Sequence, residues 1–269
     1  MKLGCSTVLF NQLDIYGALQ HIAWAGYEGA ELAYIPNMVE HVELNIKQPY
    51  IEEVKCIAKK LGIRLFAIHT DVGDHNENRI KSMTILFDVA FKLSIPVVTI
   101  SAGGKSDNKE ITNEVLSYIS KLCKLAESRG ITLAIKCHPG HSIYNTDTLI
   151  QTLQQINSPA LGVNLDPGNL YRAGEDPSES ILRIGGRIVH THFHDCPNQD
   201  QLIATPEQKI PGRGVLNFFQ IITRLKAVGY DSAIDTQVTG ALMFPLSRQM
   251  GIAAEARGHL NRCLQELTR

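Results

Sequence analysis

Several short apolar segments of this chain carry ionisable side chains at every second position. In one of them His190, His192 and His194 share one parity, while Val189 and Phe193 share the other. The same kind of placement, near the end of an apolar segment, holds for Glu31, His69, Lys136, His138, Asn164, Asp166, Asp235 and Gln237. Imidazole and carboxylate groups transfer protons and bind divalent cations, so this set predicts acid–base or metal-assisted chemistry.

The alternation has a structural meaning because successive side chains of a strand point to opposite faces. Burial of a polar row is costly unless its members are paired, so the row needs an explanation. One explanation is a set of residues that only hydrogen-bond one another, and for any single histidine it is the more common one. Because six segments end in such groups with consistent parity, we favour a binding or catalytic site.

The elements that must position these residues repeat one unit. An amphipathic helix is followed by a turn that usually contains glycine, which is a C-cap signal, and then by a short apolar strand. Helical spacing of apolar residues is clear over residues 111–126 and 215–228. The unit predicts strands at residues 2–6, 29–33, 63–69, 96–101, 131–137, 161–166, 187–194 and 232–238.

Strands that alternate with helices predict a parallel sheet. Eight such units predict an α/β fold of the (β/α)8 TIM-barrel type, with a single domain over residues 1–269. A doubly wound open sheet is the alternative, but residues 5–11 lack the G-x-G-x-x-G turn that usually opens one. In a TIM barrel the active site lies at the carboxyl ends of the strands, which is where the polar side chains fall.

Composition excludes several other classes of protein. Lys and Arg number 26 against 27 Asp and Glu, so no broad basic face is available to nucleic acid. No apolar run approaches the length of a membrane span. From the charge balance and the lack of such a run, we expect neither nucleic acid nor a membrane as a partner. The 6 cysteines include no C-x-x-C pair, which argues against a zinc knuckle and for reduced thiols in a cytoplasmic protein.

Six motifs stand along the chain: Gly-Tyr-Glu-Gly-Ala-Glu-Leu at 26–32, Leu-Ala-Ile-Lys-Cys-His-Pro-Gly at 133–140, Leu-Gly-Val-Asn-Leu-Asp-Pro-Gly-Asn at 161–169, His-Thr-His-Phe-His-Asp at 190–195, Ile-Pro-Gly-Arg-Gly at 210–214 and Gly-Tyr-Asp at 229–231. Taken in this order, they resemble the xylose isomerase-like TIM barrels, in particular the sugar phosphate isomerase/epimerase group, over nearly the whole chain. The resemblance implies a divalent cation (Mn²⁺, Zn²⁺, Mg²⁺ or Co²⁺) held by Glu, Asp, His and Glu at the ends of strands five to eight. The matching positions are Lys136, Asp166, His192 and Asp235, and Asn169 replaces a histidine that is common in the family.

The resemblance implies isomerisation or epimerisation of a small sugar or sugar phosphate through an enediolate. It makes Asp166, His192 and Asp235 the metal ligands and Lys136 and Asp235 the catalytic residues. Lys136 reverses the charge at the first ligand position, and a positive charge there would repel the cation. The alternative functions are a non-catalytic carbohydrate-binding barrel and a lyase or dehydratase of a related hydroxy-keto compound.

Three interpretations of Lys136 follow. In the first, a weakened metal site remains, and Lys136 is the general base or a donor to a substrate oxygen. In the second, no metal binds, and the ammonium pairs with Asp166 and Asp235. In the third, the lysine forms an imine with the substrate.

Further residues are expected to bind hydroxyl or phosphate oxygens of the substrate. The candidates are His69, His138, Asn169, His194, Lys209 and Arg213. The last two flank a Pro-Gly turn that the resemblance places beside the site, and either cation suits a phosphate. Residues 238–246 are apolar for a loop and are expected to form a lid, a contact in a homo-oligomer or core for the last helix.

Overall fold

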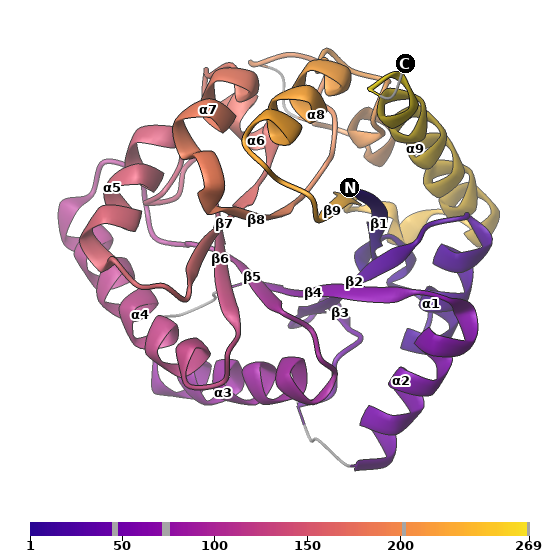
Figure 1. The fold of residues 1–269 in the computed structure, drawn as a ribbon, viewed down its shortest axis with the longest axis horizontal. Coiled ribbons are helices and arrows are strands. Elements are labelled where there is room, and N and C mark those ends of the chain that lie inside the picture. Colours follow the sequence, from indigo (N-terminus) through magenta and orange to yellow (C-terminus); the bar gives the residue numbers. More distant parts are fainter. Residues whose placement is uncertain (45–47, 72–75, 201–202, 268–269) are drawn as a thin grey trace.

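The computed structural model describes residues 1–44, 48–71, 76–200 and 203–267. Its strands form an inner ring that helices surround (Figure 1). The strands are β1 (Lys2–Ser6), β2 (Gly29–Ile35), β3 (Val39–Glu40), β4 (Arg64–Asp71), β5 (Val97–Ser101), β6 (Thr132–Lys136), β7 (Leu161–Leu165), β8 (Ile188–Thr191) and β9 (Ala233–Thr236).

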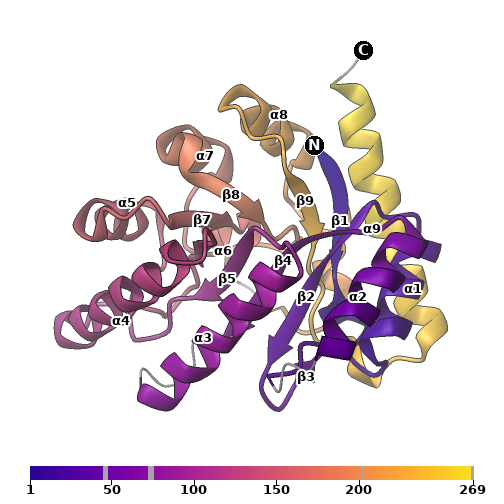
Figure 2. The ribbon, with the colours of Figure 1, turned by 60° about the horizontal axis from the view of Figure 1, so that its bottom comes forward.

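The helices lie outside this ring, as the view turned by 60° also shows (Figure 2). They are α1 (Ile15–Trp24), α2 (Gln48–Leu61), α3 (Glu77–Lys92), α4 (Lys109–Glu127), α5 (Thr146–Ile156), α6 (Pro167–Arg172), α7 (Pro177–Ile184), α8 (Phe218–Ala227) and α9 (Leu246–Glu266). Most of them begin at an Asn or Asp whose side chain accepts a backbone N–H of the first turn, which satisfies a donor that the helix itself leaves unpaired. These capping residues are Asp14, Asn76, Asn108, Asn145, Asp166, Asp176 and Asn217.

The strand order around the ring is β8-β7-β6-β5-β4-β2-β1-β9, and each hydrogen-bonded pair along it is parallel. The ring closes through a bridge between Phe193 and Thr236, with a 2.7 Å bond from the Phe193 N–H to the Asp235 carbonyl. The short β3 pairs antiparallel with β2 and is not a barrel strand, so the fifth strand of the barrel is β6.

The TIM-barrel prediction is confirmed, and all eight predicted strands form. The predicted strand at 187–194 is longer than the observed β8, because beyond Thr191 the pairing is reduced to the isolated bridge between Phe193 and Thr236. The hairpin strand β3 was not predicted, since two residues are too few to show alternation.

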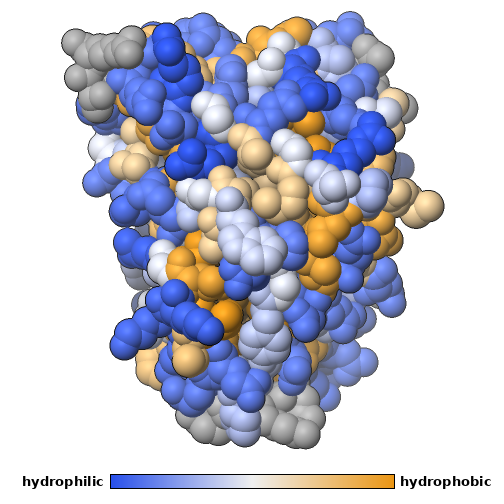
Figure 3. All heavy atoms as spheres, turned by 90° about the vertical axis from the view of Figure 1, so that its right-hand side faces the viewer, coloured by the Kyte–Doolittle hydropathy of each residue, from blue (hydrophilic) through white to orange (hydrophobic). Residues whose placement is uncertain are grey.

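The outer face over α1 and α9 is largely hydrophilic, with hydrophobic groups gathered between polar ones (Figure 3). Exposed large hydrophobic residues include Trp24 and, in the turn after β9, Leu242 and Met243. Because Leu242 and Met243 are exposed, this part of the apolar loop does not belong to the core. The lid and the homo-oligomer contact remain predictions for it. Within the described ranges, no helix is both long and apolar enough to cross a membrane.

Candidate active site

A cavity of about 570 Å³ opens at the carboxyl ends of the barrel strands. Its wall contains seven residues predicted from the sequence, namely His69, Lys136, His138, Asp166, Asn169, His194 and Lys209. It also contains Arg172 and Gln237. Arg172, the last residue of α6, was missed because one arginine on a short helix has no distinctive sequence signal.

Lys136 is the last residue of β6 and is buried in the cavity wall. Its Nζ lies 3.7 Å from Oδ2 of Asp166 and donates a 3.2 Å hydrogen bond to Oε1 of Gln237. The expected ion pair with Asp166 is therefore present. The expected pair with Asp235 is not formed, because Oδ2 of Asp235 faces Nε2 of His190 at 3.4 Å instead.

Asp166 follows β7 and caps the N-terminus of α6. Its Oδ1 accepts the backbone N–H of Asn169 and its Oδ2 accepts Nδ2 of the same residue, both at 3.0 Å. Oδ1 also lies 2.9 Å from Nε2 of His194. Burial raises the pKa of Asp166, but His194 and then Lys136 outweigh it, so this pKa lies well below its usual value and the carboxylate stays ionised.

His194 has an acceptor oxygen beside each ring nitrogen. Nε2 faces the Asp166 carboxylate, and Nδ1 lies 3.1 Å from the backbone oxygen of Asp195. Because both partners only accept, the ring makes both hydrogen bonds only as the imidazolium. Gly168 leaves room for the ring, since a Cβ there would lie 2.3 Å from Cε1 of His194. The Asp-Pro-Gly-Asn motif thus fixes both the carboxylate and its imidazole partner.

His69 of β4 is oriented by a hydroxyl group. Its Nδ1 lies 2.8 Å from Oγ1 of Thr99, which donates to Oε2 of Glu31 at 3.4 Å. Since the hydroxyl proton points to Glu31, the same oxygen accepts from Nδ1–H, and Nε2 of His69 keeps its lone pair. Burial lowers the pKa of His69 well below its usual value. His69 is therefore a neutral base on the cavity wall.

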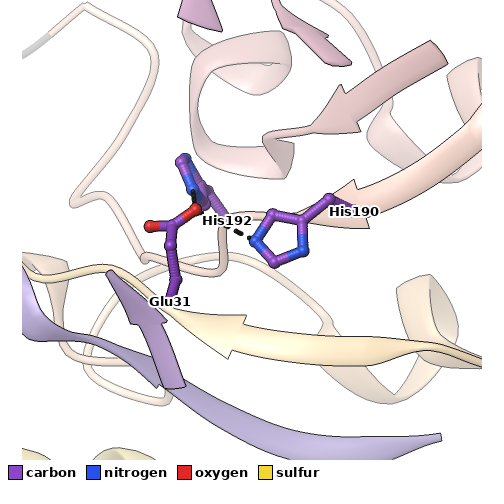
Figure 4. A group of neighbouring side chains, drawn as sticks. All are labelled: Glu31, His190 and His192. Atoms are coloured by element: carbon purple, nitrogen blue, oxygen red, sulfur yellow. Dashed lines mark hydrogen bonds and ion pairs between the residues drawn. The ribbon is translucent and has the colours of Figure 1, made fainter. Parts of the chain in front are cut away.

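A second polar cluster lies inside the barrel and does not line the cavity. Oε2 of Glu31 accepts from Nε2 of His190 at 3.1 Å and from Nε2 of His192 at 2.7 Å (Figure 4). Glu31 comes from β2, and the two histidines come from β8 and the residues that follow it. The predicted ligands Asp166, His192 and Asp235 are therefore divided, with Asp166 beside the cavity and the other two in or next to this cluster.

The two cations near the Pro-Gly turn lie in different surroundings. Lys209 lines the cavity and donates to Oγ1 of Thr239 at 2.5 Å. Arg213 does not line it, because its Nε and Nη2 bind the carboxylate of Glu255 on α9 at 2.5 and 2.7 Å. The turn itself is held by Asp195, whose side chain accepts the backbone N–H groups of Gly212, Gly214 and Leu216.

With this geometry in view, residues 19–262 match the protein family described as the xylose isomerase-like TIM barrel. The chain belongs to this family. Three relatives with named activities are 3-dehydroshikimate dehydratase of Bacillus anthracis, inosose isomerase of Halalkalibacterium halodurans and 3-oxo-isoapionate decarboxylase of Pectobacterium atrosepticum. They are 24%, 20% and 26% identical over 75%, 87% and 72% of this chain, and over 74%, 86% and 69% of their own lengths.

Two solved structures illustrate the shared fold. The probable 3-DHS dehydratase AsbF of Bacillus anthracis aligns with a TM-score of 0.80 at 19% identity, covering 97% of this chain and 100% of that one. A structure described as IOLI protein with a binding zinc atom aligns with a TM-score of 0.77 at 17% identity, covering 99% and 97%.

The four residues at the family's metal positions do not fit a divalent cation in this chain. Lys136 places an ammonium group where a carboxylate ligand would stand. Both oxygens of Asp166 already accept hydrogen bonds, from Asn169 and from His194. His192 and Asp235 face Glu31 and His190 rather than the cavity. The donor set beside the cavity is that of an ion pair and not of a metal centre.

Proposed function

We propose that this chain is an isomerase or epimerase of a small anionic sugar derivative, such as a sugar phosphate or a sugar acid, and that it transfers a proton next to the substrate carbonyl. The observation that carries the proposal is the position of Lys136, which lines the cavity 3.7 Å from Asp166. A lysine held there by a buried carboxylate supplies a fixed positive charge without a metal ion.

The reaction would begin when a base takes the proton from the carbon next to the carbonyl. The electron pair of the broken C–H bond then forms the enediolate, and negative charge develops on the carbonyl oxygen. The ammonium of Lys136 donates a hydrogen bond to that oxygen. One such fixed donor typically lowers the barrier by about 3–4 kcal/mol.

Two histidines on the cavity wall have different roles in this reaction. His69 presents an unprotonated Nε2 and is the base, while both ring nitrogens of His194 face protein oxygens, so His194 orients the Asp166 carboxylate beside Lys136. His69 lies on β4 and His194 follows β8, and these two strands each lie two places from β6 in the barrel, one on either side of Lys136. Return of the proton to the opposite face gives an epimer, and return to the neighbouring carbon gives an isomer.

The charges of the cavity support an anionic substrate. Lys136, Arg172 and Lys209 line it together with two carboxylates, Asp71 and Asp166, and Lys136 is paired with Asp166. Nε of Arg172 is buried and has no hydrogen-bond partner in the described part of the chain. A guanidinium group in a cavity wall suits the oxygens of a phosphate or a carboxylate. Two of the relatives are named for acids, 3-dehydroshikimate and 3-oxo-isoapionate.

A dehydratase is the second candidate, and the position of Lys136 on the cavity wall favours it. Elimination of water starts with the same proton removal and then needs an acid to protonate the departing hydroxyl group. The ammonium of Lys136 stands on the cavity wall and can supply that proton. One relative carries the name of such an enzyme, 3-dehydroshikimate dehydratase.

The test is incubation of the protein in deuterated water with ketoses, their phosphates and keto acids, followed by nuclear magnetic resonance. Deuterium uptake with an epimer or isomer as product supports the main proposal, and uptake with an unsaturated product supports the dehydratase. No uptake from any compound that binds by calorimetry would refute both and leave a carbohydrate-binding barrel. Borohydride treatment that leaves the mass of the Lys136 peptide unchanged would exclude the imine interpretation.

The anionic part of the proposal has its own test. Arg172→Ala should raise KM by about tenfold or more for an anionic substrate and leave KM for its uncharged analogue unchanged. Arg183→Ala is the matched control, because Arg183 forms a surface pair with Asp147 and does not line the cavity. An equal effect of Arg172→Ala on both substrates would contradict an anion-binding role.

A further inference from the structure

We propose that His138 and His141 together form a subsite that selects a hydroxyl group of the substrate and rejects an oxygen that can only accept hydrogen bonds. Both side chains line the cavity, and His141 was not among the residues predicted from the sequence. The inference rests on the proposed function and deepens it, because it names a group of the substrate that this part of the cavity recognises.

The two imidazole rings stack on each other in the loop that follows β6. Their centroids lie 4.3 Å apart, and the ring planes are tilted by 30°. Backbone hydrogen bonds close this loop on itself, since the N–H of His141 donates to the carbonyl of His138 and the N–H of His138 donates to the carbonyl of Ile143, both at 3.1 Å. The two rings are therefore carried by one hydrogen-bonded turn.

The glycine-rich loop after β5 fixes the orientation of His141. The backbone N–H of Gly103 donates to Nδ1 of His141 at 3.2 Å, and the carbonyl of Gly103 accepts the N–H of Ser142 at 3.0 Å. Gly104 permits this close approach, because its φ is +74° and a Cβ there would lie 2.2 Å from Oγ of Ser142. The Gly-Gly pair thus holds the ring of His141 against its neighbour on the cavity wall.

Backbone contacts also decide which nitrogen of each ring carries the proton. Burial lowers the pKa of both histidines, to about 4 for His141, so both rings are neutral near pH 7. Nδ1 of His138 lies 2.8 Å from the carbonyl oxygen of Pro139, which only accepts, so this nitrogen holds the proton. Nδ1 of His141 accepts from Gly103, so the proton of His141 is on Nε2. Nε2 is therefore an acceptor in His138 and a donor in His141.

The two Nε2 atoms are available to a ligand. Among the described residues, neither atom has a hydrogen-bond partner. Neither atom belongs to the buried polar atoms that lack a partner, so both are accessible from outside the protein. Because both side chains line the cavity, a substrate bound there can reach them.

A fixed acceptor beside a fixed donor matches a hydroxyl group, which donates one hydrogen bond and accepts another. A ketone, carboxylate or sulfate oxygen has no proton for the lone pair of His138 and leaves that atom without a partner. The charge of Lys136 adds to the lowering of the pKa of both rings, so its ammonium is near the pair. The substrate class that fits is a hydroxy-carbonyl compound whose hydroxyl group stands close to the reacting carbonyl.

The first test determines the two tautomers in the wild-type protein, by long-range proton–nitrogen NMR with isotope-labelled histidine. The ring proton should be on Nδ1 of His138 and on Nε2 of His141. His138→Gln and His141→Gln assign the signals, because each variant lacks those of one ring. The reverse assignment, or a proton on Nε2 of both rings, would overturn the proposal.

The second test measures the binding of xylitol, a polyol with neither a carbonyl nor a charge, by calorimetry. His141→Phe should weaken xylitol binding by about tenfold or more, because the donor is lost. His21→Phe on α1, which does not line the cavity, is the matched control and should leave the affinity unchanged. An unchanged affinity in His141→Phe, or a wild type that does not bind xylitol, would overturn the proposal.

The wild type provides a third measurement that does not depend on the folding of any variant. Xylitol should move the Nε2 signal of His138, whereas sulfate, which has no proton to donate, should leave it in place. Movement of this signal by sulfate and not by xylitol would show an anion site instead. None of these measurements uses turnover, so a protein that binds xylitol in this way and catalyses no deuterium uptake would refute the proposed function alone.

Discussion

Lys136→Met tests the central part of the proposed mechanism, because it removes the ammonium group and keeps a side chain of similar length. At a separation of 3.7 Å between Nζ and Oδ2 of Asp166, two unit charges attract each other by about 4 kcal/mol at an effective dielectric constant of about 20. A developing enediolate oxygen at a similar distance from the Lys136 ammonium would be stabilised by a comparable energy. We therefore expect kcat to fall about 10²- to 10³-fold, the usual effect of losing one oxyanion donor.

The same substitution should affect stability much less than turnover. Asp166 would keep three hydrogen-bonding contacts, from Nε2 of His194 at 2.9 Å and from the backbone and side-chain nitrogens of Asn169 at 3.0 Å. Because the carboxylate stays compensated, the free energy of unfolding should fall by only about 1–2 kcal/mol. The buried methionine would also fill most of the lysine's volume.

The assay combines the rate of deuterium uptake by the substrate with urea unfolding of the same samples. Lys121→Met on the exposed surface of α4 is the matched control and should change neither quantity. Lys136→Met that retains more than a third of the wild-type rate would refute the role of the ammonium. A large loss of rate that is matched by a large loss of stability would show a structural residue instead.

Three further predictions concern the residues around Lys136. Gly168→Ala should lower kcat at least tenfold, because its Cβ would displace the ring of His194 from Asp166. Gly251→Ala on α9, with nothing within 4 Å, should leave activity intact and raise stability by up to about 1 kcal/mol. Equal rates in the two variants would count against His194 as the group that orients Asp166. Thr99→Val removes the hydroxyl group that orients His69, so steady-state kinetics should show a lower kcat and an unchanged KM. A change in KM alone would contradict the role of His69 as the base. Burial, with smaller contributions from His138 and Lys136, lowers the pKa of His141 to about 4. The unfolded chain binds a proton at this residue near pH 6.5, whereas the folded protein binds it only near pH 4. The free energy of unfolding should therefore fall as the pH drops from about 6.5 to 4. His141→Gln should flatten that fall in urea unfolding at pH 7 and pH 5, and an unchanged slope would refute the assignment.

Much of the candidate site could be predicted because β-strand alternation is local information. The parity of Lys136, Asp166 and His194 places all three on the inner side of consecutive strands, and the structure puts them on one cavity wall. The Asp-Pro-Gly-Asn motif likewise encodes its own geometry, since the cap, the turn and the close approach to His194 all lie within four residues. A resemblance in motif order then suffices to indicate the family.

The sequence by itself thus determined the eight strands, the barrel and the inward-facing polar residues, because period and turn chemistry are properties of neighbouring residues. Which of these residues meet was decided only by the tertiary structure. Strand pairing shifts register between Ala30 and Glu31 and between Val163 and Asn164, and such irregularities change the height at which side chains enter the barrel. Contacts between residues about 160 positions apart, such as Glu31 with His192, depend on that height and on closure of the ring, and no local pattern records either.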